Sequence, residues 1–340
     1  MNSRQRLARA ISLDEPDRVP VFPMAIGWPA RLVGATQRQY YTDPAVMAAA
    51  QIEAVRRLRW DAVLCGSGVW RLHPLRPDAV GQEEDEDPSL RAVIVAEPAH
   101  LARLTVPDFA ADPFASVPLR AIRRLRAALG PDFPIWLGVD SPWQYACLMR
   151  GVQGFMMETI DRPEFVDELV AFGYEAMAAL ARAGVAAGAE IYLMDALASP
   201  NQISPNTYRR WAQPYERRMA ELVHSLGARQ ILHICGDTTR NLEDMAGTGS
   251  DVLEIDSAVT MAKAKERVGD RVCLKGNVDP VGTLLQGTPE AVEAECRAII
   301  AAAGRGGGLI LSSGCQIPRD TTVENVHALT AAAERWGWRG

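Results

Sequence analysis

A histidine and a cysteine stand two positions apart in the stretch ILHICGDTT, residues 231–239. The stretch begins as an apolar strand, and side chains two apart on a strand point to the same face. His233 and Cys235 therefore face one space at the end of a buried strand. Cys315 follows another apolar run, 308–314, near the C-terminus. We expect the three side chains to converge if these two strands belong to one sheet.

Two thiolates and an imidazole form a ligand set that Zn²⁺ prefers, whereas Mg²⁺ and Ca²⁺ prefer oxygen. Three protein ligands leave one coordination position for a substrate or a water, as in catalytic zinc sites. The residues therefore predict an open zinc site at His233, Cys235 and Cys315. The spacing alone leaves one alternative, because a buried cysteine often serves as a small hydrophobic side chain.

The elements that would position these ligands alternate between apolar runs and amphipathic helical patterns. The apolar runs cover 18–26, 61–65, 134–140, 189–195, 229–235, 251–256, 271–277 and 308–314. Nearly continuous apolar runs are typical of parallel strands buried on both faces. The alternation predicts an α/β fold, a single (β/α)₈ TIM barrel over residues 1–340. We expect a loop/β insertion after strand 2, with an acidic loop (GQEEDEDPS) and a β excursion near RAVIVAEP, 91–98.

In such barrels the chemistry lies at the carboxyl ends of the strands. Aromatic, sulfur-containing and amide side chains at these ends are predicted to bind substrate, because indoles stack on flat or apolar molecules. The alternatives are that the tryptophans pack the loops and that the asparagine caps a turn. The predicted substrate-binding residues are Met24, Trp28, Trp70, Trp143, Tyr145, Met194 and Asn277.

Two acidic residues, Asp195 and Glu254, fall at the ends of neighbouring strands and are predicted to be catalytic. Each is a candidate proton source, fourth zinc ligand, or partner for the second N–H of a metal-bound histidine. A plain salt bridge at the strand end is the alternative for either residue.

The bulk composition excludes several classes of function. The formal net charge of −6 gives no electrostatic support for binding nucleic acid. The first twenty residues lack the apolar core of a secretory signal, and no apolar run approaches the ~18–20 residues of a membrane span. We therefore expect a cytoplasmic protein, with no membrane partner and with reduced cysteines.

Four segments occur in order along the chain: HICGDTT, DVLEID, KGNVDP and LSSGCQIPRDTTVEN. Together they resemble the uroporphyrinogen decarboxylase superfamily, and specifically its zinc-dependent methyltransferase branch that works with corrinoid proteins. The resemblance implies that the zinc ligands are His233, Cys235 and Cys315. The decarboxylases have an arginine-rich loop after the first strand. Here the corresponding stretch is PMAIGWPARLVG, residues 23–34, which lacks that loop, so we do not expect decarboxylation of a porphyrinogen.

The resemblance implies transfer of a methyl group from a small methylated donor to a corrinoid. The predicted indole-lined mouth favours an aryl methyl ether as donor, and hence O-demethylation. The corrinoid (cobalamin) must arrive on a separate partner protein, because the sequence has no D-x-H-x-x-G cobalamin-binding motif. A homodimer is compatible with the sequence.

Three alternatives stay open from the sequence. One is methyl transfer from a methylcorrinoid to a thiol, and another is alkyl transfer to a thiol without a corrinoid. The third is a barrel without zinc, either an enzyme similar to uroporphyrinogen decarboxylase or a non-catalytic protein that binds a tetrapyrrole.

Overall fold

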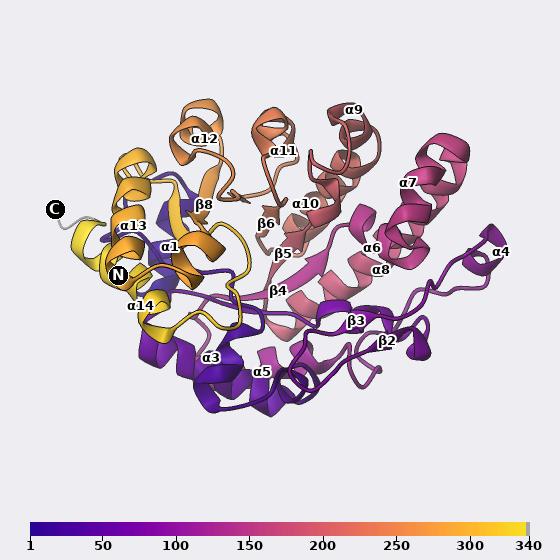
Figure 1. Ribbon diagram of the computed structural model, residues 1–340, viewed down its shortest axis with the longest axis horizontal. Coiled ribbons are helices and arrows are strands. Elements are labelled where there is room, and N and C mark those ends of the chain that lie inside the picture. The colour runs from indigo at the N-terminus through magenta and orange to yellow at the C-terminus, as the bar shows by residue number, and fades with distance from the viewer. Residues whose placement is uncertain (338–340) are drawn as a thin grey trace.

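The computed structural model describes residues 1–337. It contains a curled sheet of seven parallel strands in the order β1-β4-β5-β6-β7-β8-β9, with helices around it (Figure 1). The predicted α/β barrel is confirmed. The strands are β1 (Val63–Cys65), β4 (Ile135–Asp140), β5 (Glu190–Met194), β6 (Gln230–His233), β7 (Val252–Glu254), β8 (Cys273–Val278) and β9 (Leu309–Ser313).

The first predicted strand, 18–26, is reduced to a single bridge between Val21 and Leu311 of β9. The N–H of Phe22 donates to the Leu311 carbonyl at 3.0 Å, and the N–H of Asp61, just before β1, donates to the Val21 carbonyl at 2.8 Å. This segment thereby closes the ring between β9 and β1. The strand is short because Pro20 and Pro23 on either side have no N–H to donate to a ladder.

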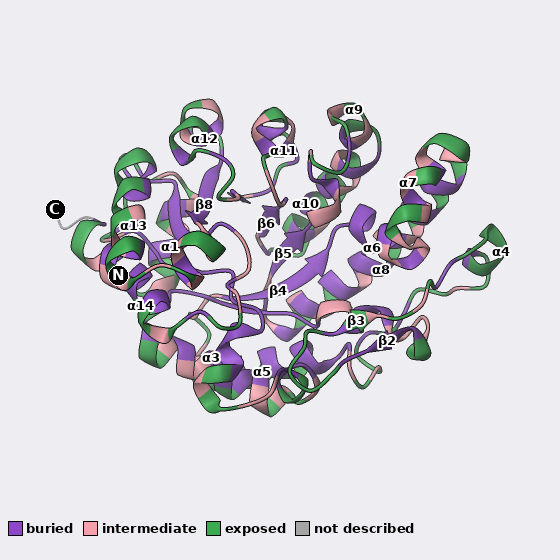
Figure 2. Ribbon diagram, viewed as in Figure 1, coloured by how far each residue is buried: buried purple, intermediate pink, exposed green. Residues whose placement is uncertain are grey.

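Helices cover the outside of the ring, and their buried faces pack on the strands while the opposite faces are exposed (Figure 2). The larger helices are α1 (Ser3–Ile11), α3 (Pro44–Leu58), α5 (Val117–Leu129), α6 (Pro142–Arg150), α7 (Val152–Asp161), α8 (Pro163–Ala187), α10 (Gln213–Ser225), α12 (Met261–Val268), α13 (Pro289–Ala303) and α14 (Val323–Trp336). The shorter ones are α2 (Gln37–Thr42), α4 (Pro98–Leu101), α9 (Pro205–Thr207) and α11 (Leu242–Ala246).

The longest helix, α8, is apolar and long enough to cross a membrane by length and composition alone. Half of its most apolar window is buried inside the structure, where the helix packs against β4, β5 and α6. This packing is that of a core helix of the barrel.

The chain between β1 and α5 forms the expected insertion after the second barrel strand. Its hairpin pairs β2 (Val80–Gly81) with β3 (Ser89–Leu90), so the predicted β excursion at 91–98 was placed too far along the chain. Residues 94 and 95 do not pair with a strand, because the N–H groups of Ile94 and Val95 both donate to the Met149 carbonyl at the end of α6.

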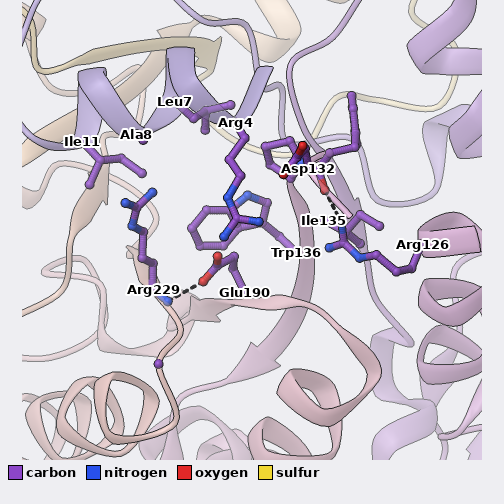
Figure 3. A pocket seen from close by; sticks show the side chains of 13 residues that line it. Arg4, Leu7, Ala8, Ile11, Arg126, Asp132, Ile135, Trp136, Glu190 and Arg229 are labelled. Atoms are coloured by element: carbon purple, nitrogen blue, oxygen red, sulfur yellow. Dashed lines mark hydrogen bonds between the residues drawn. The ribbon is translucent and has the colours of Figure 1, made fainter. Parts of the chain in front are cut away.

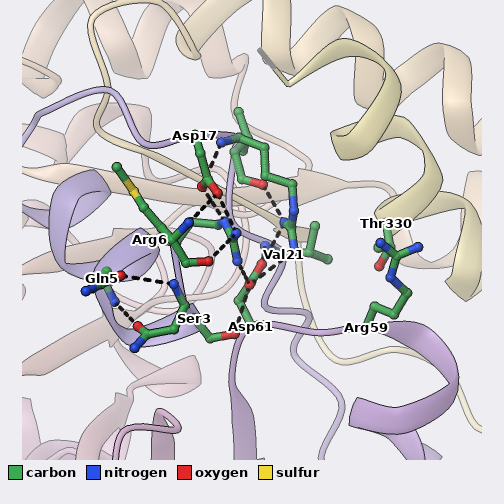
Figure 4. A network of polar contacts seen from close by, with 12 residues as sticks. Ser3, Gln5, Arg6, Asp17, Val21, Arg59, Asp61 and Thr330 are labelled. Atoms are coloured by element: carbon green, nitrogen blue, oxygen red, sulfur yellow. Dashed lines mark hydrogen bonds and ion pairs between the residues drawn. The ribbon is translucent and has the colours of Figure 1, made fainter. Parts of the chain in front are cut away.

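A buried ionic network fastens the N-terminal helix to the barrel (Figure 4). Asp61 is 1% exposed and accepts hydrogen bonds from Arg6 at 2.6 Å, from Arg18 at 2.8 Å and from the N–H of Val21 at 2.8 Å. Arg6 also pairs with Asp17 at 2.7 Å. One carboxylate therefore joins α1, the closing segment at Val21 and the start of β1.

Candidate metal centre

The strand register brings four polar or sulfur-containing side chains into one layer near the carboxyl end of the barrel. Met194 of β5 is paired with His233 of β6, His233 with Glu254 of β7, and Glu254 with Lys275 of β8. His233 is 1% exposed, and Glu254 and Lys275 have no exposed surface. The histidine therefore stands beside a carboxylate because the two strands are neighbours in register.

The three predicted metal ligands converge. The Nε2 atom of His233 lies 3.1 Å from Sγ of Cys235 and 3.8 Å from Sγ of Cys315, and the two sulfur atoms are 3.8 Å apart. A tetrahedral Zn²⁺ with Zn–S near ~2.3 Å and Zn–N near ~2.05 Å requires S···S of ~3.8 Å and S···N of ~3.6 Å. The S···S side and the side from His233 to Cys315 match these values, whereas the side from His233 to Cys235 is shorter by about 0.5 Å. The sulfur atoms are too far apart for a disulfide, which needs ~2.05 Å.

Two glycines hold the cysteines in place. Gly236 has φ of +82°, and a Cβ there would lie 2.9 Å from the Oγ of Ser199. Its N–H donates to Asp256 at 2.8 Å, which ties the loop after β6 to the loop after β7. A Cβ on Gly314 would lie 2.4 Å from the backbone nitrogen of Ser257. Glycine is therefore favoured beside each cysteine: Gly236, after Cys235, by its positive φ, and Gly314, before Cys315, by the close approach of the Ser257 backbone.

The second nitrogen of His233 faces the barrel interior. Its Nδ1 lies 3.3 Å from Oε2 of Glu254, whose other oxygen accepts hydrogen bonds from Lys275 and, at 3.0 Å, from Ser312. Lys275 also donates to Tyr192 at 3.2 Å. A carboxylate behind a ligating histidine fixes the orientation of the ring and strengthens it as a ligand. Glu254 lies within ion-pair distance of His233, where such a partner would stand, but the two atoms do not form an aligned hydrogen bond.

Burial controls the charge of this interior group. Desolvation raises the pKa of Glu254 to about 7, and the Lys275 charge opposes the shift. Desolvation likewise lowers the pKa of Lys275, against the attraction of Glu254.

The thiols of Cys235 and Cys315 differ in acidity. Hydrogen bonds from Cys235 and then His233 lower the pKa of Cys315 to about 4, against its burial. The pKa of Cys235 is raised, because it donates to Cys315 and is partly buried. The opposite shifts favour a thiolate at Cys315, and thiolates are the form that binds metal. Within residues 1–337, no other group of three or more His, Cys, Asp or Glu side chains converges in this way.

Asp195 lies beside the site rather than in it. Its N–H donates to the His233 carbonyl at 2.8 Å, and its Oδ1 accepts from the N–H of Ala198 at 3.1 Å. Complete burial raises its pKa to about 7, while hydrogen bonds with Ser141 and Glu216 oppose the shift. Its carboxylate is not part of the ligand triangle.

The structure places the predicted aromatic residues mostly among the loops. Trp143 and Tyr145 have no exposed surface and Trp28 has 1%. The indole N–H groups of Trp28, Trp70 and Trp143 donate to Thr321, Gln82 and Leu197, at 2.9, 3.1 and 3.1 Å. The hydroxyl of Tyr145 lies 3.4 Å from the Arg71 carbonyl. These contacts match the alternative in which the aromatic side chains pack the loops.

Trp28 also lines a pocket of about 220 Å³ that includes Gln316, the residue after Cys315. Among the other predicted residues, Met194 pairs in register with His233, and the N–H of Met24 donates to Ser313 at 3.2 Å. The amide of Asn277 is committed to the loop after β7, where it donates to the carbonyls of Asp256 and Val259. Its side chain therefore holds that loop.

The sequence reasoning missed two groups of residues near the mouth. Lys275 and Ser312 support Glu254, as described above. Arg71 forms a buried ion pair with Asp140 at the end of β4, and Gln144 donates to the same carboxylate. Asp140 follows an apolar run, and this strand-end position was the available signal; no local pattern marks Lys275 or Arg71.

The uroporphyrinogen decarboxylase (URO-D) family model matches residues 2–336, and the chain belongs to this family. The chain is 34% identical to the methylcobamide:CoM methyltransferase MtaA of Methanosarcina barkeri, over 64% of this chain and 63% of that protein. It is 30% identical to MtbA of Methanosarcina mazei, named as the same kind of enzyme, over the same shares. The matched segment thus spans less than two thirds of the length of these relatives.

Longer matches extend over nearly the whole chain. The uroporphyrinogen decarboxylase of Xanthomonas oryzae pv. oryzae is 29% identical over 98% of this chain and 99% of its own. The solved structure of a methyltransferase from Methanosarcina mazei superposes with a TM-score of 0.90 at 28% identity, covering 98% of this chain and 99% of that one. The relatives are enzymes of both kinds, so the site must decide between them.

Proposed function

We propose that the protein is a zinc-dependent methyltransferase that moves a methyl group between a corrinoid held by a separate protein and a small substrate. The observation that carries the proposal is the triangle of His233 Nε2, Cys235 Sγ and Cys315 Sγ, with sides of 3.1, 3.8 and 3.8 Å. The names of the MtaA and MtbA relatives and the fold of the Methanosarcina methyltransferase support it.

His233, Cys235 and Cys315 would hold the zinc ion. Bound there, Zn²⁺ would lower the pKa of a substrate thiol and keep it as a nucleophilic thiolate at neutral pH. Nδ1 of His233 lies 3.3 Å from Glu254, and Nε2 lies beside the two sulfur atoms. The pocket lined by Trp28 and by Gln316, the residue after Cys315, is a candidate entry for a small molecule.

We propose a thiol as the methyl acceptor, which reverses the direction that the sequence favoured. Demethylation of an aryl methyl ether was predicted from three indoles at the mouth, and these indoles are engaged by loop carbonyl and amide groups. The names of the MtaA and MtbA relatives describe transfer from a methylcobamide to coenzyme M. In this direction the thiol loses its proton and gains the methyl group that the corrinoid gives up.

One arginine near the mouth argues against a decarboxylase. Arg71 is buried, pairs with Asp140 and donates to the Gly68 carbonyl. Cationic side chains that grip a polyacidic tetrapyrrole need free donors, and those of Arg71 are in use.

The test combines metal analysis with an assay in both directions. We expect near-stoichiometric zinc and thiol-dependent consumption of methylcobalamin, followed by its absorbance. Cys235→Ala should lose zinc and turnover, whereas Cys147→Ala, which alters a buried cysteine of α6, should keep both. Demethylation of methoxylated aromatics with reduced cobalamin, without activity on thiols, would show that the methyl group moves from the small substrate to the corrinoid. Turnover of uroporphyrinogen, or methyl transfer by a zinc-free protein, would overturn the proposal.

A further inference from the structure

A second cavity lies at the other end of the barrel, beneath the N-terminal helix (Figure 3). Its volume is about 160 Å³, and it is bounded by α1 and by the amino-terminal ends of β4 and β5. Arg229, which lines it, precedes β6, whereas His233 ends that strand. Four residues of extended chain span ~13 Å, so this cavity is separate from the metal centre.

Three arginines line the cavity: Arg4 from α1, Arg126 from α5, and Arg229 from the turn before β6. Arg126 is held in place, because it donates to the carbonyls of Gly130, Pro131, Phe133 and Gly188. Arg4 has a single 3.3 Å contact to the Pro131 carbonyl. Figure 3 shows the side chains of Arg4 and Arg229 extending into the space between α1 and the start of β5.

The positive charge of this cavity is incompletely balanced. Asp132 and Glu190 also line it, but in the described part of the chain neither forms an ion pair with Arg4, Arg126 or Arg229. Glu190 instead accepts a hydrogen bond from the backbone N–H of Arg229. Burial, and after it the charge of Arg4, lower the pKa of Arg126, as expected where cations crowd together.

The remaining walls are apolar. Leu7, Ala8 and Ile11 form one side, on the face of α1 that covers the barrel, and Phe133 and Trp136 form another. A pocket with apolar walls and a few convergent charged groups is the usual form of a small-molecule site. An apolar cavity of ~150 Å³ accommodates a benzene ring, which sets the size of ligand that this one can take.

We propose that this cavity binds a small carboxylate with an apolar body, about the size of benzoate. Arg4 and Arg229 are its anion-binding groups: within residues 1–337 the guanidinium of Arg229 forms no hydrogen bond, and that of Arg4 has the 3.3 Å contact to Pro131. Arg126 positions the loop that carries Asp132 and Phe133. The site is independent of the metal centre and of the proposed methyl transfer.

The test is calorimetric titration of the full chain with benzoate, with benzamide as a neutral molecule of the same shape. We expect benzoate to bind at least about tenfold more tightly, because a charge-assisted hydrogen bond is lost with benzamide. Arg229→Gln and Arg4→Gln should each weaken benzoate by a similar factor. Arg103→Gln, which removes an exposed arginine outside the cavity, should leave the affinity unchanged. Cys235→Ala should also bind benzoate normally.

Three results would overturn the proposal: no saturable binding of benzoate, equal binding of benzoate and benzamide, or unchanged affinity in both cavity variants. Inorganic phosphate that binds as tightly as benzoate would overturn the requirement for an apolar body. The comparison of benzoate with benzamide uses the unmodified protein, so the test stands even if a variant folds poorly.

Discussion

Replacing Lys275 with methionine tests whether the contacts of Lys275 with Glu254, and of Glu254 with His233, increase the affinity of the site for zinc. Lys275 and Glu254 have no exposed surface, and the lysine shares the Glu254 carboxylate with Ser312. Methionine has a similar length and no charge, so it removes the ion pair with little change in packing.

The expected effect on zinc follows from the charge of Glu254. Desolvation already raises the pKa of Glu254 to about 7 while Lys275 opposes the shift. Without Lys275 this pKa rises further, so the carboxyl group is neutral near neutral pH and no longer strengthens His233 as a ligand. Loss of such a partner lowers metal affinity by about 10- to 100-fold, or roughly 1.4–2.7 kcal/mol.

Zinc affinity is measured by competition with a chromophoric chelator, and stability by urea unfolding of the metal-free protein. Removing one partner of a buried ion pair costs about 3–5 kcal/mol, and protonation of Glu254 reduces this cost. The double variant Lys275→Met/Glu254→Gln leaves no buried charge in the pair. It should be more stable than the single variant and still bind zinc weakly. A folded Lys275→Met protein with zinc affinity within about twofold of the parent would refute the reasoning.

Three further predictions concern the frame of the barrel and its loops. Asp61→Ala should lower the free energy of unfolding by about 3 kcal/mol in urea, because it leaves Arg6 without its buried partner; Asp78→Ala, in an exposed pair, should cost less than ~1 kcal/mol. Arg6 lowers the pKa of Asp17 below its usual 3.8, so Asp17 contributes its stability above that pH and loses it as the pH falls further. Asp17→Asn should therefore cost at most ~1 kcal/mol at neutral pH, since its side chain is 37% exposed, and the difference should vanish in acid. Gly314→Ala should displace the adjoining cysteine and weaken zinc binding by at least about tenfold, measured by chelator competition.

Each of these predictions has a result that contradicts it. Equal losses of stability in Asp61→Ala and Asp78→Ala would show that the buried network stabilises the fold no more than an exposed ion pair does. If the free energies of unfolding of Asp17→Asn and the parent differed by the same amount from neutral to acid pH, the ion pair of Asp17 with Arg6 would not be the cause of the difference. Normal zinc affinity in Gly314→Ala would show that the loop before the cysteine adapts.

The ligand triangle could be predicted from sequence because its signals are local. The spacing of His233 and Cys235 fixes a shared face, and the apolar runs place both residues and Cys315 at strand ends. The ring was predicted for the same reason, since each strand is a distinct run. Its first strand shrank to one bridge because prolines flank Val21.

The rest of the site depends on contacts between distant segments. Lys275 lies within the run RVCLKGN, and from the sequence alone it is one charged residue in an apolar strand. Only the pairing of β7 with β8 shows that it stands beside Glu254. The orientation of Trp28 depends on the Thr321 carbonyl, near the other end of the chain. No local pattern specifies such a partner, so the positions of the aromatic residues could be predicted but not their roles.

The closing bridge at Val21 gives the metal a second, mechanical consequence. The bridge joins the first segment to β9, the strand that leads to Cys315, while His233 ends β6 across the ring and Cys235 lies in the loop after it. An ion bound by all three side chains would link the ends of β6 and β9. It would thereby oppose opening of the strand ring where the first segment pairs with β9. Ions that bind only the closed ring stabilise it by mass action. Amide hydrogen exchange around residues 20–22 and 309–313 should therefore slow when zinc is added.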